Sequence, residues 1–232
     1  MGVDPSKNSG KLKDLIGVQL QSSGLSPTIT VKEAMQLFSA YHGVKPRYDL
    51  LKRMNLWDKS NTQYQGLSGG QAKRLLIALA VCHNPQILIL DEPTAALDVE
   101  SRVELHSLIK ELKDQGTTIL LATRDMAEAE KMADRIAILL KGKIMIIDTP
   151  KKIVASGTTK TKISVRTVGT SLAELSDIFV EEYYVFYSDK PGKKVSELMN
   201  IIEEKEDSLI DLRMERPSLE ERFLEITSNG GI

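Results

Sequence analysis

Residues 87–92 read Ile87-Leu88-Ile89-Leu90-Asp91-Glu92, four apolar residues that run directly into two carboxylates. A short continuous apolar run is typical of a strand buried on both faces of a parallel sheet. Residues 118–122, Thr118-Ile119-Leu120-Leu121-Ala122, show the same pattern. Between the two runs, apolar residues recur at helical spacing until Gly116, which predicts a strand–helix–strand unit. The predicted fold class is therefore α/β with a parallel sheet.

The two carboxylates, Asp91 and Glu92, follow a predicted parallel strand at its carboxyl end. Open α/β sheets bind their ligands at this end. The first acid suits a magnesium ion, held directly or through water, and the second suits a water molecule that it polarises towards a terminal phosphate. The alternative for this pair alone is an acidic turn that merely ends the strand.

A glycine-containing loop, Leu67-Ser68-Gly69-Gly70-Gln71, precedes a predicted helix that reaches about His83. Two adjacent glycines let the backbone approach a phosphate closely, and the first amides of the helix present positive charge to an anion. Ser68 adds a hydroxyl. The alternative is a Gly-Gly turn that only starts a helix. Together with the carboxylates, this loop favours a nucleotide site.

The order of these motifs resembles the ABC ATPase family, whose signature loop reads as residues 67–71 do here. In that family the signature loop of one chain caps ATP held by a second chain, which implies nucleotide-binding roles for Leu67, Ser68, Gly69, Gly70 and Gln71. Ala95-Ala96-Leu97-Asp98 resembles the D-loop that crosses to the second subunit, and this adds Asp98 to the nucleotide-binding set.

The same resemblance implies a metal site and a catalytic group. Asp91 matches the Walker B aspartate, and Gln21 matches the Q-loop glutamine that touches magnesium; Gln19 is a weaker candidate. Glu92 matches the catalytic glutamate. The implied cofactors are therefore ATP and Mg2+.

Arg124 stands where the family has a histidine that hydrogen-bonds the terminal phosphate. Arginine can donate to phosphate, but it neither accepts a hydrogen bond nor deprotonates near neutral pH. We therefore assign Arg124 to the catalytic switch position with altered chemistry. The alternative is a surface cation that pairs with Asp125 or faces solvent.

The family's Walker A loop, G-x-x-x-x-G-K-S/T, does not occur in these 232 residues. Near the start, Gly10-Lys11 has Pro5 in place of the first glycine and Leu12 in place of the hydroxyl, so we interpret it as a loop dipeptide. We expect the chain to be truncated before the Q-loop and to lack the Walker A strand. Apolar surface of the sheet should then be uncovered.

The expected organisation is a P-loop NTPase-like core at residues 1–150 with a helical insertion at about 28–66, a linker at 151–162 and a small α+β appendage at 163–232. Thr30 and Glu33 form a T-x-x-E capping box that starts a helix of the insertion, Ser218 and Glu221 form another, and Gly142 marks a hairpin. Residues 216–225, Arg-Pro-Ser-Leu-Glu followed by Phe-Leu-Glu, resemble the C-terminal extension of ABC-2 type, drug-efflux exporters.

Composition narrows the function classes. Lys and Arg total 31 against 32 Asp and Glu, so no general positive field favours nucleic acid. The apolar runs are too short to span a bilayer. The three histidines, His42, His83 and His106, lack metal-ligand spacing and are expected to be structural or solvated.

The sequence thus predicts the ATPase subunit of an ABC exporter, cytoplasmic and peripheral on the inner face of the cell membrane through a separate permease, which selects the substrate. Without Walker A, this chain alone is expected to be inactive. One alternative is a non-hydrolysing subunit that contributes only its signature loop to another chain. A weaker one is an ABC protein of DNA repair or translation, although the paired cassettes or long coiled coils of those proteins do not occur here.

Overall fold

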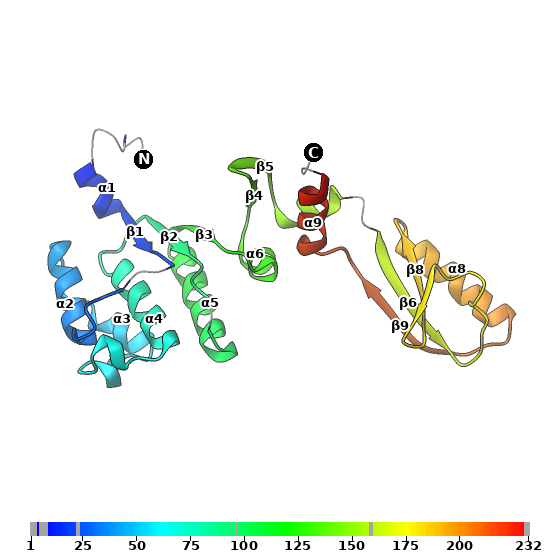
Figure 1. The fold of residues 1–232 in the computed structure, drawn as a ribbon, viewed down its shortest axis with the longest axis horizontal. Helices are drawn as coiled ribbons and strands as arrows, with labels where there is room; N and C mark the ends of the chain where they lie inside the picture. The colour runs from blue at the N-terminus through cyan, green and yellow to red at the C-terminus, as the bar shows by residue number, and fades with distance from the viewer. Residues whose placement is uncertain (1–3, 5–8, 22–23, 96, 158–159, 230–232) are drawn as a thin grey trace. The chain divides into compact units, whose positions relative to one another are not determined.

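The computed structural model describes residues 4, 9–21, 24–95, 97–157 and 160–229 (Figure 1). The chain forms two compact units, residues 1–125 and 126–232. The boundaries predicted from the sequence, at 150, 151–162 and 163, stay predictions.

The first unit contains a parallel sheet and several helices. In chain order its elements are α1 (Ser9–Leu15), β1 (Ile16–Gln19), α2 (Val31–Tyr41), α3 (Tyr48–Arg53), the 3-10 turns η1 (Trp57–Lys59) and η2 (Tyr64–Gly66), α4 (Gly69–Ala80), β2 (Ile87–Asp91), α5 (Val99–Asp114) and β3 (Thr118–Ala122).

Strand β2 is the centre of the three-stranded sheet, whose order is β1-β2-β3 with all strands parallel. Its Leu88 and Leu90 are fully buried. Helix α4 packs so closely on β1 that a Cβ at Gly17 would lie 2.1 Å from the carbonyl oxygen of Ala80. The α/β class with a parallel sheet is confirmed.

The opposite face of this sheet is open. Val18 and Leu120 point to it and are 47% and 61% exposed. Burial on both faces, predicted for β2 and β3, is therefore wrong for β3 and incomplete for β2, because no element described in the first unit lies over this face.

The helical insertion starts with the predicted capping box. Thr30 Oγ1 accepts from the Glu33 amide at 3.2 Å, and Glu33 Oε2 accepts from the Thr30 amide at 2.9 Å. The next helix of the insertion, α3, ends after Arg53, because Asn55 adopts φ +54°, a left-handed conformation that stops a helix.

The start of the described chain differs from the predicted loop. Residues 9–15 form α1, in which Leu12 and Leu15 stand three residues apart and are half-buried. Gly10-Lys11 is thus helical and is not a loop; most of residues 1–8 lie outside the described part.

The second unit contains a hairpin and a four-stranded sheet. Its elements are α6 (Met126–Met132), β4 (Ile136–Leu140), β5 (Lys143–Asp148), α7 (Pro150–Ala155), β6 (Thr161–Thr167), β7 (Ile178–Val180), β8 (Tyr183–Ser188), α8 (Pro191–Glu204), β9 (Leu209–Glu215) and α9 (Leu219–Asn229).

The hairpin of β4 and β5 is antiparallel, as predicted, and turns through Lys141 and Gly142, both at positive φ. Helix α7 occupies the first half of the predicted linker because Thr149 caps its start and Pro150 preorganises the first turn. Buried Ile138 of β4, Ile153 of α7 and Leu219 of α9 form one cluster.

The α+β character of the tail is confirmed. Its antiparallel sheet has the order β7-β8-β6-β9, and α8 packs on it through Leu198 and Ile202, which join Ile163, Val165 and Phe186 in one buried cluster. The Ser218–Glu221 capping box is also present. Among the described residues, no helix has both the length and the apolar character that a membrane crossing requires.

Two histidines connect the insertion to the core. The ring of His42, at the end of α2, stacks on that of His83, after α4, with centroids 3.7 Å apart and planes 4° apart. Burial lowers the pKa of both rings. His42 further lowers the pKa of His83, Lys13 lowers that of His42, and Asp14 opposes these effects.

We expect acid to destabilise the first unit through this pair. Because both pKa values are depressed when folded, the unfolded chain binds protons first as the pH falls below about 6.5, so stability present above that pH is lost below it. Thermal unfolding between pH 7.5 and 5 should show a smaller loss for His83→Gln than for the parent chain. An equal loss would assign the pH dependence to other groups.

Candidate functional site

The two predicted carboxylates lie at the carboxyl edge of the sheet. Asp91 is the last residue of β2 and pairs with Ala122 of β3. The Glu92 amide continues the ladder by donating to the Ala122 carbonyl at 2.9 Å. The Glu92 side chain is 15% exposed. The structure therefore places both acids at the ligand-binding end of a parallel strand.

The backbone of Glu92 is in a left-handed conformation, with φ +47°. This conformation costs a residue with a side chain about 1–2 kcal/mol. Two donors meet its carbonyl oxygen: Lys73 Nζ at 2.7 Å and the Ala95 amide at 3.3 Å. These hydrogen bonds offset the backbone cost and define where the chain leaves the strand.

Arg124 contacts the side-chain carboxylate of Glu92. Its Nε lies 3.4 Å from Glu92 Oε1, and its side chain is 88% exposed. Asp125 instead lies 3.9 Å from a guanidinium nitrogen of Arg102. Arg124 thus meets Glu92 and solvent, and the pairing with Asp125 that we considered is not the one seen.

The loop at residues 67–71 forms the start of α4. Ser68 is the N-cap: its Oγ accepts from the Gln71 amide at 3.3 Å, and Gln71 Oε1 accepts from the Ser68 amide at 3.0 Å. The cap uses one lone pair of the hydroxyl, so the Ser68 proton stays available to an acceptor such as a phosphate oxygen. Leu67 directly precedes the cap.

The two glycines of this loop have different surroundings. Apart from its chain neighbours and the backbone of its own helix, no described atom lies within 4 Å of a Cβ built at Gly69, so an approaching group has access to the backbone there. A Cβ at Gly70 would lie 2.7 Å from Ser101 Oγ. Gly69 therefore belongs to the open face of the loop, and Gly70 to its packing on α5.

Ser101 links the signature loop to Asp98. The Ser101 amide and hydroxyl donate to the two Asp98 carboxylate oxygens at 2.8 and 2.9 Å, so Asp98 is the N-cap of α5. These hydrogen bonds, the backbone one first, lower the pKa of Asp98. The structure thus brings Gly70 and Asp98 together within one chain; Ala96 of the predicted D-loop lies outside the described residues.

Two residues of the site, Lys73 and Ser101, were missed by the sequence analysis. Their partners are distant in the chain, so no local pattern reveals them. The spacing of Ser68 and Gln71, by contrast, is the S-x-x-Q form of a capping box and carried a usable signal.

The two glutamines after β1 differ in exposure. Gln19 ends β1 beside Leu90 and is buried, with its Nε2 2.6 Å from the Leu20 carbonyl. Gln21 is exposed two residues later. Gln21 is thus the one of the two whose side chain faces solvent.

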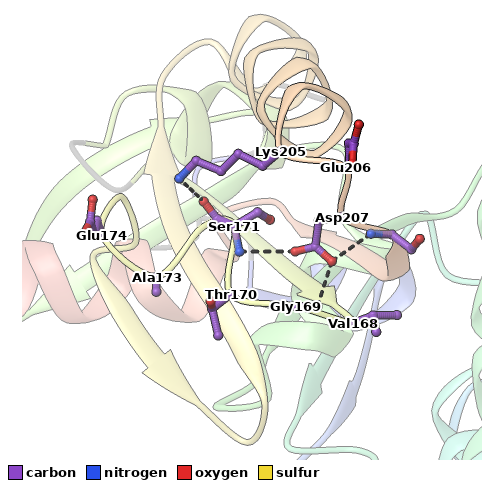
Figure 2. A pocket seen from close by; sticks show the side chains of 10 residues that line it. Val168, Gly169, Thr170, Ser171, Ala173, Glu174, Lys205, Glu206 and Asp207 are labelled. Carbon is purple, nitrogen blue, oxygen red and sulfur yellow. Dashed lines mark hydrogen bonds between the residues drawn. The ribbon is translucent and has the colours of Figure 1, made fainter.

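A hollow of about 580 Å³ in the second unit lies between the segment after β6 and the turn before β9 (Figure 2). Asp207 accepts there from the amides of Gly169 and Ser208, each at 2.7 Å, and of Ser171 at 3.2 Å. Lys205 Nζ donates to the Ser171 carbonyl at 2.9 Å. Hydrogen bonding from Ser171 and from these amides holds the pKa of Asp207 well below its usual range. We interpret this arrangement as a clamp between two loops.

Comparisons with known proteins bear on the first unit most directly. A sequence model described as ABC transporter matches residues 2–95. The arginine transport ATP-binding protein ArtM of Bacillus subtilis is 34% identical over 163 residues, which cover 67% of this chain and 68% of ArtM. The chain belongs to the family of ABC transporter ATP-binding proteins. Members of this family bind ATP, generally with Mg2+, and hydrolyse it.

Two other relatives of this ABC protein match over nearly its whole length. The linearmycin resistance ATP-binding protein LnrL of Bacillus subtilis is 28% identical over 95% of this chain and 77% of LnrL. The daunorubicin resistance ATP-binding protein DrrA3 of Streptomyces coeruleorubidus is 27% identical over 98% and 77%. A solved structure of an ATP-binding subunit of an ABC transporter, 23% identical, superposes with a TM-score of 0.61 over 66% of this chain and 67% of that one.

The different surroundings of Gly69 and Gly70 predict different costs of adding a methyl group. Both changes gain the same helix propensity, so their difference isolates the contact with Ser101. We expect Gly70→Ala to be about 1–3 kcal/mol less stable than Gly69→Ala, because the added carbon overpacks the junction of α4 and α5. Urea unfolding of both variants measures this difference in stability. Equal midpoints would show that α4 and α5 accommodate the added carbon at no cost.

Proposed function

We propose that this chain is the ATP-binding, ATP-hydrolysing subunit of an ABC exporter, coupled to a separate membrane permease. The observation that carries the proposal is the exposed signature loop, capped by Ser68 and packed through Gly70 on the helix that Asp98 starts. The names of LnrL and DrrA3, which match along the appendage as well as the core, support the exporter class.

In this proposal the signature loop acts on nucleotide held by a second ABC subunit. Ser68 offers its hydroxyl proton, and Gly69 and Gly70 offer amides of the first helical turn, which lack partners within a helix. Hydrogen bonds of this kind to a charged group contribute about 1.5–3 kcal/mol each. Leu67 and Gln71 hold the loop, and Asp98 faces the second subunit.

At the chain's own edge of the sheet, Asp91 and Gln21 would hold Mg2+ and Glu92 would orient water. A carboxylate at a strand end and an exposed amide oxygen are suitable oxygen donors for this ion. Arg124 supplies a cation at the switch position but no hydrogen-bond acceptor. The subunit would work at the inner face of the membrane, bound to its permease.

The second candidate function is a non-hydrolysing subunit that only completes a partner's site. One observation favours it: Arg124 stands at the switch position, and a guanidinium cannot accept the hydrogen bond that would orient water. Both functions need the same signature face, so they differ only in whether the chain's own site turns over.

We expect the 232-residue chain to bind ATP weakly and to hydrolyse it negligibly, because it has no loop to surround the β- and γ-phosphates. Isothermal titration with Mg-ATP and a phosphate-release assay measure the two properties. Micromolar affinity would contradict this expectation and show that other residues hold the phosphates.

The signature role can be tested with Gly69→Asp, which places a negative side chain where the backbone must approach phosphate. The partner is this chain preceded by a strand, a G-x-x-x-x-G-K-S/T loop and a helix. It also carries Glu92→Gln to block hydrolysis and Gly69→Asp to remove its own signature function. Size-exclusion chromatography with Mg-ATP should show pairing with the parent chain and none with the variant.

The control for this experiment is thermal unfolding of Gly69→Asp, which should stay within a few degrees of the parent because no described atom lies near a Cβ at this position. If a folded Gly69→Asp chain pairs as well as the parent, the loop does not act on nucleotide in a second subunit.

A further inference from the structure

Lys73 joins the helix of the signature loop to the backbone of Glu92. Its Nζ donates to the Glu92 carbonyl oxygen at 2.7 Å. Lys73 is half-buried on α4, four residues after Gly69, and therefore lies about 6 Å further along the helix axis. One side chain thus spans the distance from α4 to the turn after β2.

The hydrogen bonds to the Glu92 carbonyl favour one backbone conformation of this residue. Because Pro93 follows, the right-handed helical region is disfavoured for Glu92, which leaves extended and left-handed conformations. At the observed φ of +47°, the carbonyl meets both Lys73 and the Ala95 amide. An extended Glu92 would turn its carbonyl away from these donors, so the contacts select the left-handed form.

The charges of Asp91 and Glu92 also act on Lys73. Burial lowers the pKa of Lys73, while the carboxylates of Glu92 and then Asp91 act in the opposite direction. Both acids at the end of β2 therefore act electrostatically on the ammonium group. Arg124 meets the Glu92 carboxylate, but Lys73 holds its backbone.

We propose that Lys73 is a positioning residue for Glu92, which holds its left-handed backbone and thereby makes the carboxylate at the end of β2 respond to the signature helix of the same chain. The role of Glu92 in hydrolysis rests on the proposed function. The coupling itself concerns this chain alone and needs no nucleotide, so its failure is distinct from a failure of that function.

The test is amide hydrogen exchange of the 232-residue chain, resolved by NMR. In Lys73→Met, which keeps an aliphatic stem without the ammonium, the amides of Glu92 and Ala95 should exchange at least about tenfold faster, because they lie in the turn that Lys73 holds. Lys73→Arg, which still donates, should restore exchange to within about threefold of the parent. The matched control is Lys110→Met, a change of an exposed lysine on α5.

A merely structural lysine would accelerate exchange throughout the first unit, including Leu88 and Leu90 of β2. Unchanged exchange at Glu92 and Ala95, or equal acceleration along β2, would overturn the proposal. Should Lys73→Met fail to fold, the scalar coupling across the hydrogen bond between Lys73 Nζ and the Glu92 carbonyl carbon is measured in the parent. Its absence also overturns the proposal.

The link to the signature loop is tested by a double-mutant cycle. Ser68→Ala removes the N-cap of α4 and should speed exchange of the Glu92 amide in the parent. In the Lys73→Met chain, Ser68→Ala should add less than about twofold, because the connection is already lost. Additive effects would show that α4 and Glu92 are independent and would overturn the coupling.

Discussion

Parallel pairing on both sides of β2 is the constraint on which the first unit depends. Its register with β1 and β3 brings three carboxyl ends to one edge, so Gln19 pairs with Leu90 and Asp91 with Ala122 although the partners are far apart in sequence. Leu88 and Leu90 bury themselves on one face and fix this register, because a shift of one residue would expose both. The position of Glu92 follows from that register, since its amide makes the next ladder bond.

The signature loop shows how two identical residues can serve different physical purposes. Gly69 has space above it, so what its missing side chain provides is access. Gly70 touches Ser101, so what its missing side chain provides is the close contact of α4 with α5. Since Ser101 also satisfies the Asp98 carboxylate, the open loop and the D-loop aspartate form one packed unit. A change in the angle between these helices would move both.

Local and periodic features of the fold could be predicted from the sequence, and contacts between distant segments could not. The apolar runs gave β2 and β3, and the T-x-x-E and S-x-x-E patterns gave two capping boxes, because both signals reside within a few residues. The exposure of Leu120 depends on what lies over the sheet, which periodicity does not report. The contacts of Lys73 with Glu92 and of Ser101 with Gly70 join segments whose sequence spacing carries no signal.

The strength of the ion pair between Arg124 and Glu92 decides whether Arg124 fixes the position of the glutamate. Its ion pair with Glu92 is long, at 3.4 Å, and the arginine is 88% exposed, so solvent screens the attraction. Exposed ion pairs of this kind contribute about 0–1 kcal/mol to stability. This is too little to offset the cost of the left-handed backbone of Glu92. The hydrogen bonds to the Glu92 carbonyl act on the main chain itself and include a cation in a half-buried position. Arg124 therefore does not lock the glutamate; what it changes is the chemistry of the switch position, where a guanidinium can contact phosphate but cannot accept the hydrogen bond through which an imidazole would orient water.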